Sequence, residues 1–68
     1  MTLGERIVAL RQEKGFSQAK LARKSGICRQ LLCSYEKNKV EPRLINALCI
    51  ADVLGCSLDY LARGGEEK

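Results

Sequence analysis

Apolar residues recur at helical spacing along most of the chain and divide it into five short segments. Leu3, Ile7 and Leu10 lie three or four residues apart, which predicts a helix with one buried face beginning near residue 3. Thr2 and Glu5 form a T-x-x-E capping box at its start. The first segment is therefore expected to be an amphipathic helix.

Glycine and serine mark the boundaries of the following segments. Gly15, Gly26 and Gly55 each follow an apolar-periodic run, as expected at the C-terminal ends of helices. Ser17 and Ser57 stand where the second and fifth helices should begin, and serine is a preferred N-cap residue. These positions predict short loops between the helices.

A third helix is expected to begin near Cys28 or Arg29. It should stop at Asn38, because asparagine tolerates the left-handed backbone conformation better than most residues. Pro42 is expected to set the backbone angle for the start of a fourth helix. The predicted apolar stripe of that helix consists of Leu44, Ala47, Leu48, Ala51 and Leu54.

The composition fits one small folded domain. The chain has 68 residues, of which 46% are hydrophobic and 29% charged. With no strand pattern, we expect an all-α domain over residues 1–63 and a frayed, charged end over residues 64–68. The sequence contains neither an apolar run long enough to cross a bilayer nor a secretory signal, so we expect the protein in the cytoplasm.

The excess positive charge is concentrated between residues 17 and 39. Six lysines and arginines against one glutamate give this segment a net charge of +5, whereas the whole chain carries +4. A basic patch on two short helices joined by a tight turn is typical of a protein that docks on a polyanion.

The same segment has the residue types that a helix-turn-helix requires. Ala22 is small where the two helices should cross, Gly26 allows the turn, and Ile27 can fill the space beneath it. Leu32 and Tyr35 can anchor the second of the two helices to the core. The outer face of that helix would remain free to contact a ligand.

The chain resembles the Cro and phage-repressor type of helix-turn-helix family, also called Xre-like. The resemblance covers residues 3–62 and is carried by LGERIVALRQEKGFSQAKLA, SGI, SYE, the proline at 42 and ALCIADVLGCSLDYL. It implies a compact five-helix, lambda-repressor-like domain that binds an inverted-repeat operator in double-stranded DNA as a homodimer. It also implies a bacterial or phage-encoded regulator of transcription that works at the nucleoid.

The resemblance assigns roles to individual positions. The positions of the third helix that are implied to face base edges are Arg29, Gln30, Cys33 and Ser34. The positions implied to contact the DNA backbone are Ser17, Gln18, Lys20, Lys39 and Arg43, and Gln18 is also implied to buttress the third helix. A structural ion pair is implied between Arg11 and Glu36, joining the first helix to the third.

Several positions depart from the family pattern. Cys28 stands where the third helix usually has a serine or threonine N-cap, and a thiol is a poor hydrogen-bond acceptor, so a weaker cap is expected. Lys20 replaces a common glutamate, and Asn38 replaces a common glycine, which we take to be a mild change. Cys28 also adjoins Arg29 at a helix start, which makes its thiol a candidate for redox sensitivity.

Ile45 and Cys49 occupy normally polar positions four residues apart, so they should form one apolar spot on the fourth helix. We expect this spot to contribute to a two-fold interface together with Leu58 and Tyr60. The same spot would also suit a module that masks a protein partner such as a toxin.

The chemistry of an enzyme is absent from the sequence. There is no histidine, no Gly-rich phosphate loop and no C-x-x-C pair, so we expect neither catalysis nor a cofactor. The cysteines are most simply reduced, partly buried hydrophobic residues, with a four-thiolate metal site or a disulfide framework as alternatives. They are Cys28, Cys33, Cys49 and Cys56.

Overall fold

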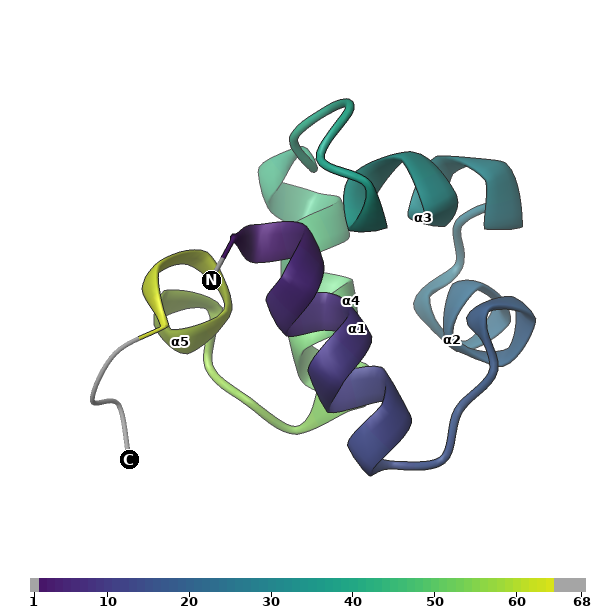
Figure 1. Ribbon diagram of the computed structural model, residues 1–68, viewed down its shortest axis with the longest axis horizontal. Helices are drawn as coiled ribbons and strands as arrows, with labels where there is room; N and C mark the ends of the chain where they lie inside the picture. The colour runs from purple at the N-terminus through teal and green to yellow at the C-terminus, as the bar shows by residue number, and fades with distance from the viewer. Residues whose placement is uncertain (1, 65–68) are drawn as a thin grey trace.

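Five helices surround one core in the computed structural model, which describes residues 2–64 (Figure 1). The helices are α1 (Leu3–Glu13), α2 (Gln18–Ser25), α3 (Arg29–Glu36), α4 (Leu44–Leu54) and α5 (Leu58–Arg63). No strand forms within these residues, and none of their helices has the length and apolar character needed to span a bilayer. The all-α architecture is as predicted, while the prediction of a frayed end falls mainly on residues 65–68, outside the described part of the chain.

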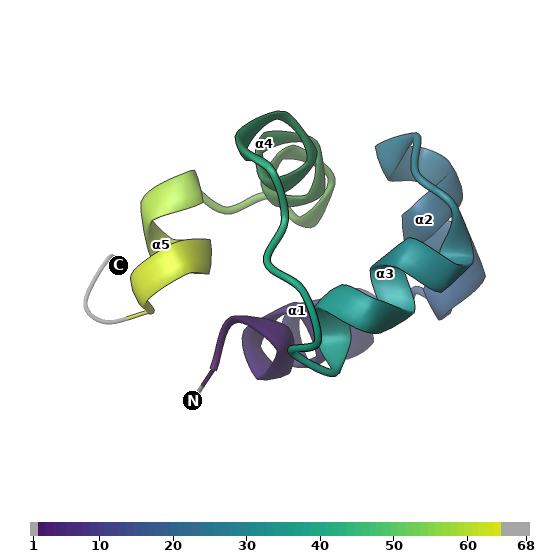
Figure 2. The ribbon, with the colours of Figure 1, turned by 90° about the horizontal axis from the view of Figure 1, so that it is seen from above.

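The helices are arranged around α1 and α4. In Figure 1, α1 lies in front of α4, with α5 on one side and the pair α2 and α3 on the other, and the view from above in Figure 2 agrees. α3 packs against α1 and α2, α2 packs against α4, and α5 packs against α1 and α4. α3 therefore lies at one edge of the domain, with its inner side supported by its neighbours.

The helix starts follow the predicted capping residues. In the capping box of α1, the Glu5 N–H donates to Thr2 Oγ1 at 3.2 Å and the Thr2 N–H donates to Glu5 Oε1 at 3.0 Å. Ser17 and Ser57 each accept a hydrogen bond at 3.0 Å from the backbone N–H three residues later. These bonds satisfy N–H groups that have no partner within a helix.

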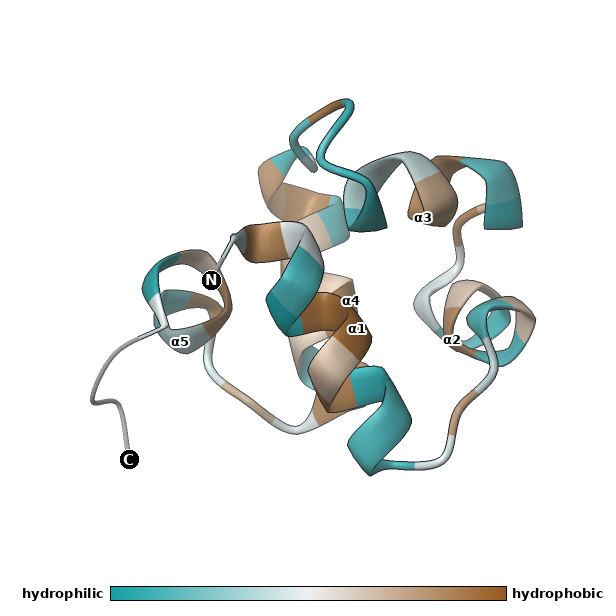
Figure 3. Ribbon diagram, in the orientation of Figure 1, coloured by the Kyte–Doolittle hydropathy of each residue, from teal (hydrophilic) through white to brown (hydrophobic). Residues whose placement is uncertain are grey.

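The core is built from every helix. Ile7 of α1, Leu61 of α5 and Ile50 of α4 are completely buried. The remaining buried members of the cluster are Leu21, Ala22, Leu32, Tyr35, Ala51 and Leu54. Figure 3 shows the corresponding pattern, with apolar positions concentrated on α4 and in the middle of α3, and hydrophilic positions on the first turn of α3.

The predicted face of α4 is wrong at two positions. Leu44 and Leu48 are 64% and 44% exposed, whereas Ile50, which was not assigned to the stripe, is fully buried. The sequence LINALCIADVL is apolar around most of its circumference, so periodicity alone does not select the buried side. α4 also begins later than predicted: Arg43 is its N-cap, and Pro42 lies just before that cap.

Arg6 attaches α5 to α1. Its side chain is buried, its Nε donates to the Leu61 carbonyl oxygen at 2.8 Å, and an Nη nitrogen donates to the Ala62 carbonyl oxygen at 2.7 Å. The last carbonyl groups of a helix lack intrahelical partners, so this arginine serves as a side-chain cap for α5.

Candidate nucleic-acid interface

The outer face of α3 is open to solvent next to the start of α2. Arg29 and Gln30 are exposed, and Cys33 and Ser34 are half-buried. A hollow of about 300 Å³ lies between the two helices and is lined by Gln18, Arg29, Gln30 and Cys33. The structure thus brings three of the four predicted base-contacting residues together at one hollow, with Ser34 one residue beyond it along the helix.

The inner face of α3 is held by the core. Leu32 is fully buried and Tyr35 is 3% exposed. The Tyr35 hydroxyl accepts a hydrogen bond from Asn46 Nδ2 of α4 at 2.9 Å. Because these contacts occupy one side of α3, its opposite side is the one available to a ligand.

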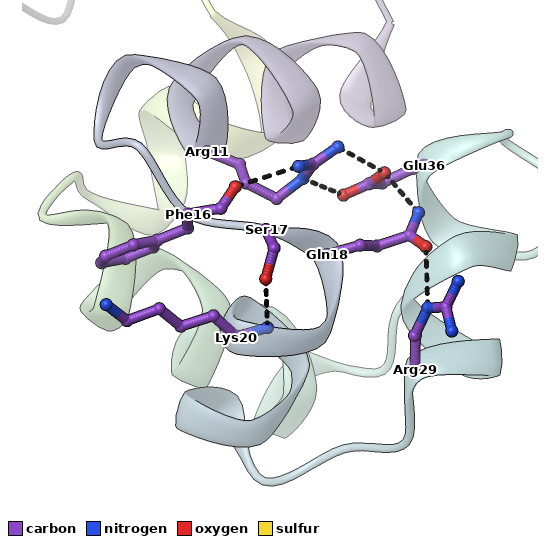
Figure 4. Close-up of polar contacts among 7 residues, drawn as sticks. All are labelled: Arg11, Phe16, Ser17, Gln18, Lys20, Arg29 and Glu36. Atoms are coloured by element: carbon purple, nitrogen blue, oxygen red, sulfur yellow. Dashed lines mark hydrogen bonds and ion pairs between the residues drawn. The ribbon is translucent and has the colours of Figure 1, made fainter.

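Arg11 and Glu36 form an ion pair between α1 and α3 (Figure 4). Arg11 Nε lies 2.8 Å from Glu36 Oε2, and the two side chains are 14% and 5% exposed. Arg11 also donates from Nη2 to Glu36 Oε1 at 3.3 Å and from Nη1 to the Phe16 carbonyl oxygen at 3.0 Å. Because the pair is well shielded from water, removing one partner would leave the other charge largely buried and uncompensated, which would destabilise the fold.

Gln18 links this ion pair to the exposed face of α3. Its Nε2 donates to Glu36 Oε1 at 2.8 Å, and its Oε1 accepts from Arg29 Nε at 3.4 Å (Figure 4). A carboxylate only accepts hydrogen bonds, so the amide nitrogen must face Glu36 and the amide oxygen must face Arg29. The side chain that the resemblance assigns to the DNA backbone is therefore engaged here in orienting Arg29.

Gly4 allows α1 and α3 to approach closely. A Cβ atom at this position would lie 2.7 Å from the Tyr35 carbonyl oxygen and closer still to that of Glu36. Sequence reasoning missed this role. The available signal was a glycine inside a helix, where it costs about 1 kcal/mol relative to alanine and so calls for a packing explanation.

The end of α3 has the hydrogen-bond pattern of a Schellman motif. Asn38 takes a left-handed conformation, with φ of 61°. Its N–H donates to the Tyr35 carbonyl oxygen at 3.1 Å, and the Lys39 N–H donates to the Ser34 carbonyl oxygen at 2.9 Å. These are the 5→2 and 6→1 bonds of the motif, so the backbone of Lys39 is fixed to the last turn of α3.

The Asn38 side chain reaches a different helix. Its Oδ1 accepts from the Gly4 N–H at 3.0 Å, and its Nδ2 donates to Thr2 Oγ1 at 2.9 Å. The family resemblance predicts that asparagine is only a mild replacement of glycine at this position. In the structure, however, its side chain has two hydrogen-bond partners at the start of α1. Both partners lie more than thirty residues away in the chain, with sequence separations of 34 and 36.

The start of α3 has no such support. Cys28 is its N-cap residue, is exposed, and makes no side-chain capping hydrogen bond. The other three cysteines are half-buried, and no group of three or more potential metal-ligating side chains occurs among the residues described.

Exposed cations occur on α2 and in the loop after α3. The predicted backbone-contacting residues Lys20, Lys39 and Arg43 are all exposed. The Nζ atoms of Lys20 and Lys24 lie 5.1 and 5.9 Å from the centre of the Phe16 ring, within the range of a cation–π contact. The ring therefore gathers two of the positive charges near the start of α2.

Three of the four large apolar residues that are exposed in the described part of the chain lie on α4. Val40, Leu44, Ile45 and Leu48 are 48%, 64%, 67% and 44% exposed, and Cys49 is half-buried. We call the residues Leu44, Ile45 and Leu48 the α4 apolar face.

Two residues predicted to join Ile45 and Cys49 at an interface lie in other surroundings. Leu58 is half-buried and lines a hollow of about 250 Å³ with Pro42 and Ala47, near the start of α4. Tyr60 is half-buried and lines a hollow beside α1 together with Leu10. Leu58 and Tyr60 therefore line two different hollows, and neither hollow includes Ile45 or Cys49.

The fold and its helix-turn-helix over α2 and α3 define the class: a lambda-repressor-like DNA-binding domain. Residues 7–61 match the family model described as Helix-turn-helix, and the chain belongs to this family. It is 41% identical over 61 residues to the SPbeta prophage-derived uncharacterized HTH-type transcriptional regulator YonR of Bacillus subtilis (strain 168). That match covers 90% of this chain and 56% of the relative.

Solved structures give the same result. The P22 c2 repressor in complex with a synthetic operator has a TM-score of 0.91 and 34% identity, covering 94% of this chain and 97% of that chain. The master regulator for biofilm formation SinR, a Bacillus subtilis protein, in complex with DNA has a TM-score of 0.84 and 34% identity, covering 88% and 97%. The chain spans about half the length of the first curated relatives it matches, 56% and 45%. The names of these relatives are those of regulators and repressors, not of enzymes.

Proposed function

We propose that this chain binds double-stranded DNA at specific sequences and thereby regulates transcription. The observation that carries the proposal is the exposed polar face of α3, with Arg29 and Gln30 beside a hollow on the most basic part of the chain. The P22 c2 repressor and SinR, which share this fold, have both been solved in complex with DNA. The protein would act in the cytoplasm, at the nucleoid.

In the proposed complex, α3 enters the major groove, which is wide enough to admit a helix. Gln18 engages Arg29 only through Nε, so the two terminal nitrogens of the guanidinium remain for a bidentate contact to guanine O6 and N7. Gln30 suits adenine N6 and N7. Cys33 and Ser34 complete the reading face farther along the helix.

The DNA backbone would be held on both sides of this face. The start of α2, at Ser17 and Gln18, carries N–H groups that precede the helical hydrogen-bond ladder and suit a phosphate. Lys20, Lys39 and Arg43 add exposed positive charge. Such contacts position the protein without reading sequence, and they make its affinity fall as salt rises.

The functional unit is proposed to be a homodimer in which a second copy covers the α4 apolar face. Aliphatic side chains that are 64% and 67% exposed, such as Leu44 and Ile45, gain most from burial against a partner surface. A two-fold dimer would place two α3 helices in successive major grooves, about 34 Å apart, and would require an inverted-repeat operator.

Selection of bound sequences from a random DNA pool at stated salt tests the DNA-binding proposal. An enriched inverted repeat is the expected result. Gln30→Ala should cost about 1–3 kcal/mol of binding and relax the preference at one base position, whereas Lys39→Ala should weaken all sequences alike and reduce the salt dependence. A pool with no enriched sequence would contradict the proposal.

Sedimentation of Ile45→Asp at micromolar concentration tests the homodimer. We expect the variant to be monomeric and the matched control Gln12→Asp, on the exposed surface of α1, to remain dimeric. An unchanged Ile45→Asp dimer would show that the interface lies elsewhere. A wild-type protein that stays monomeric would instead favour a protein partner, such as a toxin, on the α4 apolar face.

A further inference from the structure

We propose that Asn38 is a positioning residue that fixes the DNA-backbone contact of Lys39 relative to the reading face of α3. This inference rests on the proposed function. It is carried by the two connections of one asparagine: its backbone ends α3, and its side chain is bonded to the start of α1.

The backbone hydrogen bond fixes the position of the Lys39 backbone. The Lys39 N–H is bonded to the Ser34 carbonyl oxygen, and Ser34 belongs to the proposed reading face. This bond requires the left-handed conformation of Asn38 between the two residues. The position of the lysine backbone is therefore coupled to the position of the base-reading side chains.

The side-chain connection holds this turn against α1. The first N–H groups of a helix need external acceptors, and Thr2 Oγ1 already serves that of Glu5. Asn38 Oδ1 serves the Gly4 N–H, and this fixes the amide so that Nδ2 faces the Thr2 hydroxyl. Glycine at position 38 would keep the backbone conformation but lose both bonds.

A fixed turn matters because binding must otherwise order it. Lys39 is exposed and Lys37 and Lys39 flank Asn38, so a loose turn would let both cations move relative to α3. Ordering such a side chain on binding costs conformational entropy, and a turn already held in the free protein avoids part of that cost. Asn38 thus acts on DNA affinity through Lys39, without touching DNA itself.

A double-mutant cycle tests the coupling. Lys39→Ala is made in the wild-type chain and in Asn38→Gly, and affinity for the selected operator is measured at one salt concentration. We expect Lys39→Ala to weaken binding about fivefold in the wild type and less than about twofold in Asn38→Gly. The Gly4 amide should also exchange its hydrogen faster in Asn38→Gly, since it loses its acceptor.

Asn46→Ala is the matched control. It removes another asparagine hydrogen bond that holds α3, the 2.9 Å contact to the Tyr35 hydroxyl, but leaves the turn at residues 37–39 intact. Lys39→Ala should cost the same factor in this background as in the wild type. Should Asn38→Gly be too unstable for the assay, Asn38→Asp keeps the acceptor for Gly4 and loses the donor to Thr2, and it should show part of the coupling.

The outcomes separate the two proposals. If the wild type enriches an operator but Lys39→Ala costs the same factor in all backgrounds, Asn38 only stabilises the fold and the positioning role is wrong. If the wild type enriches no sequence at all, the proposed function itself fails, and the positioning role, which rests on it, fails with it.

Discussion

The two ends of α3 are held in opposite ways. At its end, Glu36 is paired with Arg11, Asn38 is bonded to the start of α1, and the helix backbone packs directly on Gly4. At its start, Cys28 makes no capping bond, and Arg29 is held by a single long contact to Gln18 at 3.4 Å. The tightly held end is the one closest to α1, and the loosely held start carries two of the four proposed base readers, Arg29 and Gln30.

This difference indicates that the two ends of α3 have different roles. The end fixes the angle and depth at which α3 projects from the domain. The start has no capping bond and leaves the proposed base readers Arg29 and Gln30 exposed. The contacts that stabilise this eight-residue helix are thus concentrated in its last turn, and its first turn has few of them.

The largest effect is expected at Gly4. Gly4→Ala would normally favour a helix, but here the added methyl group meets the Tyr35 and Glu36 carbonyl oxygens, which cannot move aside. We expect a loss of about 3–4 kcal/mol in the free energy of unfolding, measured by urea denaturation. A domain of this size has a total stability of about 3–10 kcal/mol, so much of it would be lost. A stabilised variant would show that the α1–α3 contact is loose, which would remove the contrast between the two ends.

The buried ion pair should come next. Arg11→Met keeps much of the side-chain volume but leaves the Glu36 carboxylate without its cation, and we expect a loss of about 2–3 kcal/mol. The control is Asp59→Asn, which breaks the Arg63–Asp59 pair, whose side chains are 78% and 66% exposed. That loss should stay below about 0.5 kcal/mol by the same urea measurement. Equal losses would mean that burial of the first pair contributes nothing.

The smallest effect should appear at the start of α3. Cys28→Ser supplies the missing N-cap acceptor and should raise the free energy of unfolding by about 0.5–1 kcal/mol. The reciprocal change, Ser17→Cys, removes a cap that exists at α2 and should lower it by a similar amount. Thermal unfolding of both variants measures the two shifts. If Cys28→Ser gains nothing, the start of α3 is limited by something other than its cap.

Local signals in the sequence were sufficient for most helix boundaries. The capping box at Thr2 and the serine caps of α2 and α5 depend on residues no more than three positions apart, and the structure has each of them. The turn at Gly26 is likewise set by the left-handed conformation of one residue. Such features are readable because sequence neighbours are also spatial neighbours.

Features that depend on tertiary contacts could not be predicted from the sequence. The buried side of α4 could not be chosen because Leu44, Leu48 and Ile50 are equally apolar, and only packing against the other helices distinguishes them. The partners of Gly4 and Asn38 lie about thirty or more residues away, so no local pattern announces them. Family resemblance assigned roles to Gln18 and Arg29, but their mutual hydrogen bond required coordinates.

The contacts that hold the end of α3 against α1 also bear on how the proposed DNA target of this protein could change. The contacts made by Gly4, Arg11, Glu36 and Asn38 use none of the side chains at positions 30, 33 and 34. New residues can therefore be installed at those three positions, by evolution or by grafting, while the frame that orients the helix stays unchanged. Under the proposed function, such changes would alter which bases are contacted and would leave the orientation of α3 as it is.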